Sequence, residues 1–356
     1  MEEGLPEVLH VDLEINEDEP RAGILTLLQT LRPDWSPEQV HMKMFTEGIT
    51  NRLIGCFLRP EWAWPGAWPE AWLGCGRGRG RCAGASLRAP HGPVRGPREE
   101  VRMLRLLETR GLGAKVYCSF SNGICYQFLQ GRTGRSYSQL TQPQVYRLIA
   151  AEMARLHSVQ TQSSESEPCL WKKMEHFLKL IQTSQSEERE NHRDQSENRT
   201  EMELLKSRLS RLQNPVVLSH NDLLQNNIIY DQEQGTVRFI DYEYAALNHQ
   251  AFDIGNHFNE FAGSLQRDWI KTYLQHFNHQ NLNHQENLNH QENLNHQENL
   301  HQNNHLHQET GRDVSEEEVM RLYIHVCKFP LASNLFWGMW AILQSRLSNI
   351  HFDFTR

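Results

Sequence analysis

The most informative part of this sequence is VVLSHNDLLQNNIIYDQEQGTVRFIDYEYAALNHQAFDIGNHFNE, residues 216–260. An apolar, strand-like run leads into the triplet His-Asn-Asp at 220–222, and Asn227 follows five residues after the aspartate. Two more apolar runs flank a turn at Gly235, and the second of them ends on Asp241. The pattern predicts short strands that each deliver a polar residue at their end.

These residue types, in this order, suit phosphoryl transfer. In such sites one Asp accepts or orients the proton of the nucleophile, while an Asn and a second Asp hold Mg²⁺ against the phosphates of ATP. Magnesium prefers carboxylate and carbonyl oxygens, which these side chains supply. Asp222 alone could equally well cap a turn. The joint pattern of His220, Asp222, Asn227 and Asp241 favours a catalytic site.

The segments HNDLLQNNIIY, FIDYEY and FDIGNHFNEFAG resemble the ethanolamine and choline kinases, whose fold is related to that of protein kinases. The likeness extends to FTEGITNRLIGC (45–56), REEVRMLRLLETRGLGAKVYCSFSNGICYQFLQG (98–131) and KFPLASNLFWGMWAILQ (328–344). It implies an α+β, bilobal, protein-kinase-like fold of the choline kinase type. A small β-rich N-terminal lobe, residues 1–130, would bind the nucleotide, and a larger, mostly helical lobe, residues 131–356, would carry catalysis and substrate binding.

The resemblance also implies a role for individual residues. Asp222, with His220 beside it, is the expected catalytic base, and Asn227 and Asp241 are the expected Mg²⁺ ligands. The residues expected to contact ATP are Glu47, Gly48, Asn51, Glu100, Gln127 and Leu129. The residues expected to line an amine pocket are Tyr244, Glu260, Trp337 and Trp340, which supply aromatic faces and a carboxylate. The cofactors implied are ATP and Mg²⁺.

The implied reaction is ATP-dependent phosphorylation of ethanolamine, the first step of the CDP-ethanolamine route to phosphatidylethanolamine. Ethanolamine is favoured over choline because FTEGITN, IDYEY and NHFNEFAG look more like the ethanolamine branch. A choline or dual-specificity kinase is the alternative within this class. For Asp253 and Glu243, a place in or behind the pocket and a purely structural role stay equally open. For the two tryptophans, core packing is the competing interpretation.

Residues 60–97 break the likeness. Family members carry here a strand that reads roughly V-L-V-R-I-Y-G, whose basic residue pairs with ATP phosphates and with a helix glutamate. This chain instead contains GCGRGRGRCAGASLRAPHGPVRGP at 74–97, in which glycine and proline are too dense for a central strand. We expect a disordered segment, a Glu100 without its partner, and weak activity or a catalytically impaired binding homologue. Four arginines of this segment could stand in for the missing basic residue but are expected to be solvated: Arg77, Arg79, Arg81 and Arg88.

Elsewhere the periodicity predicts ordinary elements. Amphipathic helices are expected at 21–31, 98–111, 142–156 and 314–347, and hairpins at 40–58 and 115–130. Residues 183–204 are highly charged and predict a solvated loop or helix that acts as a linker. Residues 276–308 repeat Asn-Leu-Asn-His-Gln-Glu, which favours a disordered insertion over a metal site.

Composition excludes several classes of function. The net charge of −8 leaves no basic footprint for nucleic acid or for an anionic membrane. No apolar run approaches the length of a spanning helix, and the acidic start does not resemble a signal peptide, so a cytoplasmic protein without membrane insertion is expected. The seven scattered cysteines predict reduced thiols. The partner expected is the small-molecule substrate, with a homodimer left open.

Overall fold

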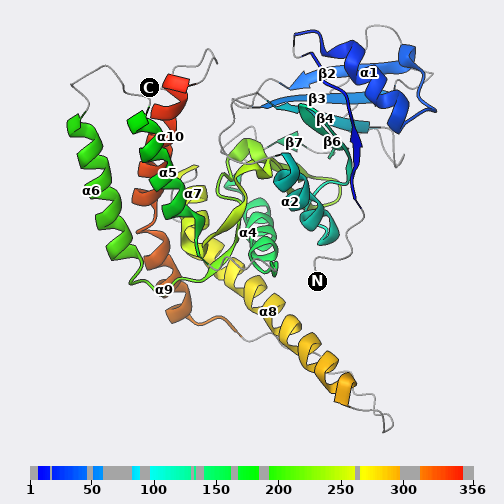
Figure 1. Ribbon diagram of the computed structural model, residues 1–356. Helices are drawn as coiled ribbons and strands as arrows, with labels where there is room; N and C mark the ends of the chain where they lie inside the picture. The colour runs from blue at the N-terminus through cyan, green and yellow to red at the C-terminus, as the bar shows by residue number, and fades with distance from the viewer. Residues whose placement is uncertain are drawn as a thin grey trace, which may run out of the picture. The chain divides into compact units, whose positions relative to one another are not determined.

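The computed structural model describes residues 7–16, 18–45, 51–58, 82–88, 97–129, 132–133, 140–161, 167–183, 192–260, 265–296 and 313–347 (Figure 1). The chain divides into two compact units. The first comprises residues 1–135, 226–244 and 341–356, and the second comprises residues 136–225 and 245–340. The expected boundary between the lobes was residue 130. Compared with the expected N-terminal lobe, the first unit additionally contains residues 131–135, 226–244 and 341–356. The division into functional lobes stays a prediction.

The first unit is built on a six-stranded sheet with the order β1-β5-β6-β4-β3-β2. Its strands are β1 (Leu9–Val11), β2 (Val40–Phe45), β3 (Asn51–Leu58), β4 (Cys82–Arg88), β5 (Val116–Phe120) and β6 (Gly123–Gln127). β1 runs parallel to β5, and the other neighbours are antiparallel. Both predicted hairpins are confirmed: β2 pairs with β3, and β5 pairs with β6 around a turn at Ser121 and Asn122.

Two helices belong to this sheet. The predicted first helix is α1 (Pro20–Leu31), which proline begins and which ends shortly before Pro33. Its side chains Ile24, Leu27 and Leu28 share one face and are buried in the core with the sheet residues Ile54 and Phe120. The second predicted helix is α2 (Pro97–Thr109), which contacts β5, and a short 3₁₀ helix, Pro37–Gln39, precedes β2. In Figure 1, α1 lies over one face of the sheet.

The expectation that residues 60–97 contain no strand is wrong. β4 (Cys82–Arg88) occupies the middle of the sheet, with β3 on one side and β6 on the other. Arg88 ends this strand, opposite Asn51, which begins β3. The backbone of a central strand pairs on both edges, so small residues such as those of CAGASLR are held by their neighbours rather than by their own propensity.

A small second sheet of the first unit has the order β10-β9-β7. Its strands are β7 (Arg132–Thr133), β9 (Ile228–Asp231) and β10 (Thr236–Phe239). The turn between β9 and β10 includes Gly235 at φ 62°, a left-handed conformation that glycine adopts without penalty. Two 3₁₀ helices, Gln225–Asn227 and Tyr242–Tyr244, lie at the entry to β9 and beyond the exit of β10.

The second unit is mostly helical. Its helices are α4 (Pro143–His157), α5 (Cys169–Thr183), α6 (His192–Leu209), α7 (Gln250–Glu260), α8 (Gln266–His296), α9 (Glu316–Val326) and the first part of α10 (Pro330–Leu347). A two-stranded antiparallel ribbon, β8 (Val216–Ser219) with β11 (Ala246–His249), lies among them. The predicted helix at 142–156 is confirmed as α4. The predicted helix at 314–347 is two helices, interrupted at residues 327–329.

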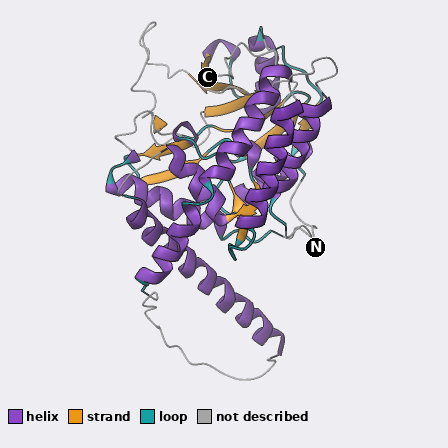
Figure 2. Ribbon diagram, turned by 90° about the vertical axis from the view of Figure 1, so that its left-hand side faces the viewer, coloured by secondary structure: helices purple, strands orange, loops and turns teal. Residues whose placement is uncertain are grey.

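Two low-complexity tracts contribute helices. α6 begins at His192, so the later part of the charged tract is helical and contacts α5. α8 continues to His296, so the expectation of disorder is wrong for residues 276–296 of the repeat. In both views the later part of α8 extends away from the other helices of its unit (Figures 1 and 2). The rest of both tracts lies outside the described residues.

One described stretch, residues 316–346, is long and apolar enough to pass a test for a membrane span. It comprises α9 and most of α10, and 44% of its apolar window is buried inside the protein. Core helices of globular proteins pass the same test, so this stretch by itself is weak evidence for a membrane span. The expected lack of membrane insertion stays a prediction.

Candidate active site

The triplet at 220–222 follows β8, and a buried carboxylate binds its backbone. Asp253, on α7, is fully buried and accepts hydrogen bonds from the backbone N–H of His220 at 2.8 Å and of Asn221 at 2.7 Å. The side chain of His220 is also buried, whereas that of Asp222 is partly exposed. The arrangement fixes the backbone of the loop, while the Asp222 side chain stays partly accessible to solvent.

A chain of side chains supports Asp253 from behind. His157, the last residue of α4, donates from Nε2 to Asp253 at 2.9 Å. Gln250 donates to the Tyr273 hydroxyl at 3.0 Å, so this hydroxyl is free to donate to His157 Nδ1 at 2.7 Å. Each member is buried, and each donor faces an acceptor. Networks satisfied in this way rigidify the groups that they hold.

The electrostatics of Asp253 follow from these contacts. Burial by itself raises the pKa of its carboxyl, but the hydrogen bonds from His157 and the His220 amide, together with the electrostatic influence of the His157 and His220 side chains, hold the pKa below its ordinary value. The carboxylate is therefore ionised at neutral pH, as its role as a triple acceptor requires. The neighbouring His257 is fully buried, and burial lowers its pKa to about 4.

The backbone is strained at the expected metal ligand Asp241 and at Asn221, the residue before Asp222. Among the described residues other than glycine, Asn221 at φ 67° and Asp241 at φ 65° alone have a left-handed conformation. Such a conformation costs about 1–2 kcal/mol and persists only where the surroundings enforce it, typically at functional sites. Two contacts enforce the left-handed conformation of Asn221. Asp253 accepts from its backbone N–H, and Asn248 donates to its side-chain oxygen at 2.7 Å.

The structure brings the two expected magnesium ligands to the same end of a hairpin in the first unit. Ile228 pairs with Phe239, and beyond this pair the Ile240 amide donates to the Asn227 backbone oxygen at 3.0 Å. Asn227 is buried, and the next residue after Ile240 is the exposed Asp241. An amide oxygen and a carboxylate thus come from adjacent strand ends.

The same unit places part of the expected nucleotide site near this carboxylate. Tyr126 of β6 is half-buried, and desolvation of its hydroxyl, together with the charges of Asp241 and Glu100, raises the pKa of that hydroxyl. Glu100 itself makes an interaction in the structure, so the expectation that it lacks any partner is wrong. Gln127, expected to meet adenine, ends β6 opposite Ala83 of β4.

The other expected nucleotide contacts are less completely described. Leu129 is half-buried just beyond β6. Asn51 begins β3, but its side chain lies outside the described residues, as do Glu47 and Gly48 altogether.

In the second unit, the two expected tryptophans of the amine pocket contact each other. The rings of Trp337 and Trp340 meet edge to face with 5.6 Å between their centroids, and both are only partly buried. Trp337 donates from its indole N–H to the side-chain oxygen of Asn256 at 2.9 Å. Tyr244 is buried in the first unit, and the side chain of Glu260, the last residue of α7, lies outside the described residues.

Comparison with known proteins agrees with this geometry. The family model described as choline/ethanolamine kinase matches residues 91–356, about three quarters of the chain. This chain belongs to the choline/ethanolamine kinase family. Human ethanolamine kinase 2 is 37% identical over 98% of this chain and 81% of its own length. Mouse ethanolamine kinase 1 is 36% identical over 99% of this chain and 91% of its own length.

Solved structures confirm the expected fold. An ethanolamine kinase of Plasmodium vivax superposes with a TM-score of 0.70, covering 95% of this chain and 86% of its own, at 21% identity. A choline kinase of Cryptosporidium parvum superposes with a TM-score of 0.67, covering 93% of this chain and 90% of its own, at 20% identity. The α+β, protein-kinase-like fold of the choline/ethanolamine kinase family is therefore the fold of this chain.

Several residues that hold the site of this choline/ethanolamine kinase were missed from the sequence. His157 bonds the anchor Asp253, Tyr273 bonds His157, and Asn256 bonds the loop, yet each lies in a helix where a polar residue can equally face water. A signal was present for Asn256, because it stands three residues after Asp253 and therefore shares its helical face. For His157 and Tyr273, the sequence offers no signal short of knowing the packing.

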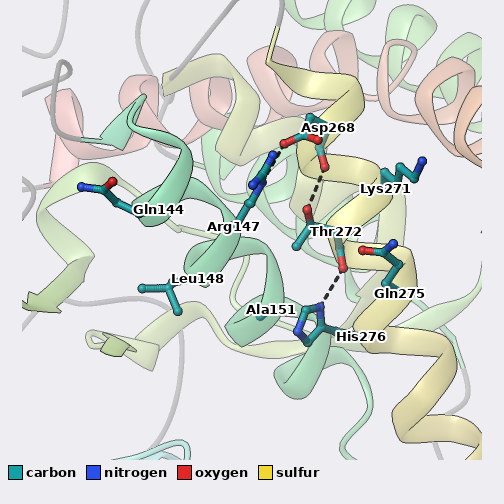
Figure 3. A pocket seen from close by; sticks show the side chains of 9 residues that line it. All are labelled: Gln144, Arg147, Leu148, Ala151, Asp268, Lys271, Thr272, Gln275 and His276. Carbon is teal, nitrogen blue, oxygen red and sulfur yellow. Dashed lines mark hydrogen bonds and ion pairs between the residues drawn. The ribbon is translucent and has the colours of Figure 1, made fainter. Parts of the chain in front are cut away.

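A shallow groove between α4 and α8 is separate from these residues. Figure 3 shows its lining, where Arg147 bonds Asp268 at 3.0 Å and His276 bonds the backbone oxygen of Thr272 at 2.9 Å. The full lining is Gln144, Arg147, Leu148, Ala151, Asp268, Lys271, Thr272, Gln275 and His276. None of the expected catalytic or substrate residues lines it, so it carries no part of the phosphotransfer site.

Proposed function

We propose that this chain transfers the γ-phosphate of ATP to the hydroxyl of ethanolamine and releases phosphoethanolamine. The observation that carries the proposal is the relation to human ethanolamine kinase 2, at 37% identity over 98% of this chain. It is supported by the anchored loop of Asp222 and by the hairpin that joins Asn227 to Asp241.

Asp222 serves as the base that orients the substrate hydroxyl and receives its proton. Two buried backbone contacts, from the His220 and Asn221 amides to Asp253, hold the loop in one conformation. A base contributes only when it lies within hydrogen-bond reach of the proton, so rigidity of this loop is part of its efficiency. The partial exposure of Asp222 gives the substrate access.

Asn227 and Asp241 fit a magnesium ion that is bound together with a nucleotide. The described residues contain no group of three or more His, Cys, Asp or Glu that could hold a metal by themselves. Magnesium commonly takes one or two protein ligands and completes its shell with phosphates and water, which matches an amide and a carboxylate. When bound, the ion supplies positive charge against the phosphates of ATP.

The amine of the substrate binds to Trp337 and Trp340, with Glu260 as the paired carboxylate. The two rings present partly exposed aromatic surface, and such surface attracts a cation by about 0.5–2 kcal/mol. The relatives named above that share more than a third of their residues with this chain are ethanolamine kinases, so choline is not the favoured substrate.

A catalytically impaired homologue is not favoured either. That alternative depended on the absence of a strand in residues 60–97, and β4 is present in the middle of the sheet. We assign the role of the basic residue that anchors the phosphates to Arg88, because it is the last residue of β4. Its role there is part of this proposal.

The proposal extends to cellular context. Phosphoethanolamine would feed the CDP-ethanolamine route to phosphatidylethanolamine in the cytoplasm. The net charge of −8 supports a protein that binds neither nucleic acid nor an anionic membrane. The described thiols, among them the buried Cys56, Cys118 and Cys125, are free, which suits a reducing compartment. Assembly as a homodimer stays open.

A phosphotransfer assay tests the proposal directly. Purified protein is incubated with Mg-ATP and with ethanolamine, choline or no acceptor, and ADP and the phosphorylated amine are measured. We expect ethanolamine-dependent turnover that Asp222→Asn abolishes and that Asp313→Asn, an exposed aspartate outside the site, leaves intact. Turnover with choline alone would replace the substrate assignment, and no acceptor-dependent turnover by the folded wild type would refute the proposal.

A further inference from the structure

Asn256 stands between the tryptophans and the catalytic loop. It lies on α7, is 4% exposed, and all of its side-chain polar atoms are engaged. Its oxygen accepts from the Trp337 indole at 2.9 Å and from the Ser333 hydroxyl at 2.6 Å. Its amide nitrogen donates to the backbone oxygen of Asn221 at 3.3 Å. One side chain therefore bonds α10 on one side and the loop on the other.

The orientation of this amide is fixed by its partners. An indole N–H can only donate, and a backbone carbonyl can only accept, so the oxygen of Asn256 must face Trp337 and its nitrogen must face Asn221. No other side chain of similar size offers an acceptor and a donor in these two directions. An aspartate at this position would keep the bond to Trp337 and would oppose the Asn221 carbonyl with a second acceptor.

The peptide group that Asn256 binds is the one immediately before Asp222. Asp253 holds the N–H of Asn221, and Asn256 holds its carbonyl, so both ends of a residue with left-handed φ are fixed from α7. A rotation of the Asn221–Asp222 peptide would redirect the Asp222 side chain. The contact of Asn256 is thus placed to set the direction of the catalytic carboxylate.

The other end of the link is the aromatic surface of the amine site. Trp337 packs edge to face against Trp340 and against Phe336, at centroid distances of 5.6 Å and 5.1 Å. Its ring is therefore held on two sides, and its N–H is held by Asn256. A cation bound on this surface contacts a ring whose position is tied to the loop.

We infer that Asn256 is a positioning residue that couples the tryptophan surface of the amine site to the carbonyl preceding Asp222. This inference rests on the proposed function for its kinetic meaning. Binding of the amine at Trp337 and orientation of the Asp222 carboxylate are then coupled through Asn256. An amine that displaces Trp337 therefore turns the Asp222 carboxylate away from its catalytic direction. The residue acts on turnover more than on amine affinity.

Asn256→Asp keeps the hydrogen bond with Trp337 and removes the one with the Asn221 carbonyl, so it tests the two contacts of Asn256 separately. We expect kcat with ethanolamine to fall about tenfold to a hundredfold, because the base is misoriented, while KM for ethanolamine stays within about threefold. Asn259→Asp is the matched control, since Asn259 lies on the same helix and donates to Ser333 at 3.2 Å without touching the loop. We expect its kcat to stay within about twofold. A wild-type kcat in Asn256→Asp would overturn the inference.

A second readout does not depend on phosphate transfer. In ¹H–¹⁵N spectra, Trp337→Phe should shift the backbone amide of Asp222 in the wild-type background and should leave it unmoved in an Asn256→Ala background. An unmoved Asp222 amide in both backgrounds would overturn the link, whatever the activity. A shifted amide in a wild type that does not phosphorylate ethanolamine would refute the proposed function and keep the link. A lowered melting temperature of Asn256→Asp with unchanged kcat would show a merely structural role and overturn the inference.

Discussion

Replacing Asp253 by Asn should cost both stability and turnover. The carboxylate accepts three hydrogen bonds, from His157 and from the backbone of His220 and Asn221. An amide has one accepting oxygen, so at best it keeps the two bonds that Oδ2 now accepts and turns its NH₂ against the Asn221 N–H. Two bonds then lose the contribution of charge, about 1 kcal/mol each, and one buried donor is left unsatisfied, at about 1–3 kcal/mol.

The free energy of unfolding of Asp253→Asn should therefore be about 3–5 kcal/mol below that of the wild type at pH 7. The lowered pKa of Asp253 also predicts how this difference in stability changes with pH. Because the folded-state pKa of Asp253 is lowered, its stabilisation is present above the unfolded pKa of about 4 and is lost as the pH falls through the folded pKa. The difference in the free energy of unfolding between wild type and Asp253→Asn should be constant from pH 7 to 5 and should decrease below about pH 4.

Urea unfolding followed by fluorescence measures the stability, and the phosphotransfer assay measures kcat, which should fall about a hundredfold from misplacement of the loop. Asp268→Asn is the control. Asp268 also accepts two side-chain bonds, from Tyr146 and Arg147, but it is 42% exposed, so its loss should cost less than about 1 kcal/mol. If Asp253→Asn matched this control in stability and kept the wild-type kcat, the loop would not depend on its buried anchor.

Three further changes test other parts of the structure. Asp241→Asn should raise the Mg²⁺ concentration for half-maximal activity about tenfold or more, and Asn227→Ala should raise it less strongly. Activity measured against Mg²⁺ concentration checks both. Equal metal dependence in the wild type and the two variants would contradict the ligand assignment. Trp340→Leu should raise KM for ethanolamine with little change in kcat, because it removes a cation–π face of about 1 kcal/mol; a fall in kcat alone would place this ring elsewhere. Gly235→Ala should lower the free energy of unfolding by about 1–2 kcal/mol from backbone strain alone, since φ is 62° and no atom lies within 4 Å of the added methyl; unchanged urea unfolding would contradict it.

Local sequence signals predicted the elements that depend on local physics. The helices α1, α2 and α4 follow from apolar periodicity, and the β5–β6 hairpin follows from the Asn-Gly dipeptide at 122–123, although the turn lies one residue earlier, at Ser121 and Asn122. The strand ends that carry Asp222, Asn227 and Asp241 were predicted for the same reason: short apolar runs end where a polar residue begins. These features need no knowledge of distant parts of the chain.

The sequence failed at β4, where tertiary context overrides propensity. Gly84 stands opposite Gly55 of β3 and opposite Tyr126 of β6, so its neighbours on both sides supply the backbone pairing that its own composition does not favour. A glycine-rich strand is weak alone and adequate between two formed strands. Density of glycine and proline in a window is therefore a poor argument against a central strand when only seven of its residues are needed.

The supports of the catalytic loop were invisible for a different reason. His157 lies 96 residues from Asp253 in the chain, and Asp253 lies 32 residues from Asn221. A polar residue within a helix carries no mark that tells a solvent contact from a buried hydrogen bond. Of the alternatives left open for Asp253, the structure shows a buried acid that holds the backbone of the loop carrying Asp222, and a place in or behind the amine pocket stays a prediction.

The face of α7 shows how a sequence could reveal such supports. Asp253, Asn256 and His257 stand at spacings of three and four, all are buried, and each bonds the backbone of residues 220–223. A helix that buries three polar side chains on one face must give each of them a hydrogen-bond partner. The backbone N–H and C=O groups of a loop can supply these partners. Because burial lowers the pKa of His257 to about 4, its ring stays neutral and keeps donating to the Leu223 carbonyl across the neutral range. The pattern Asp-x-x-Asn-His in an apolar helix is therefore a physical signal for a backbone loop held in place, and here that loop carries Asp222.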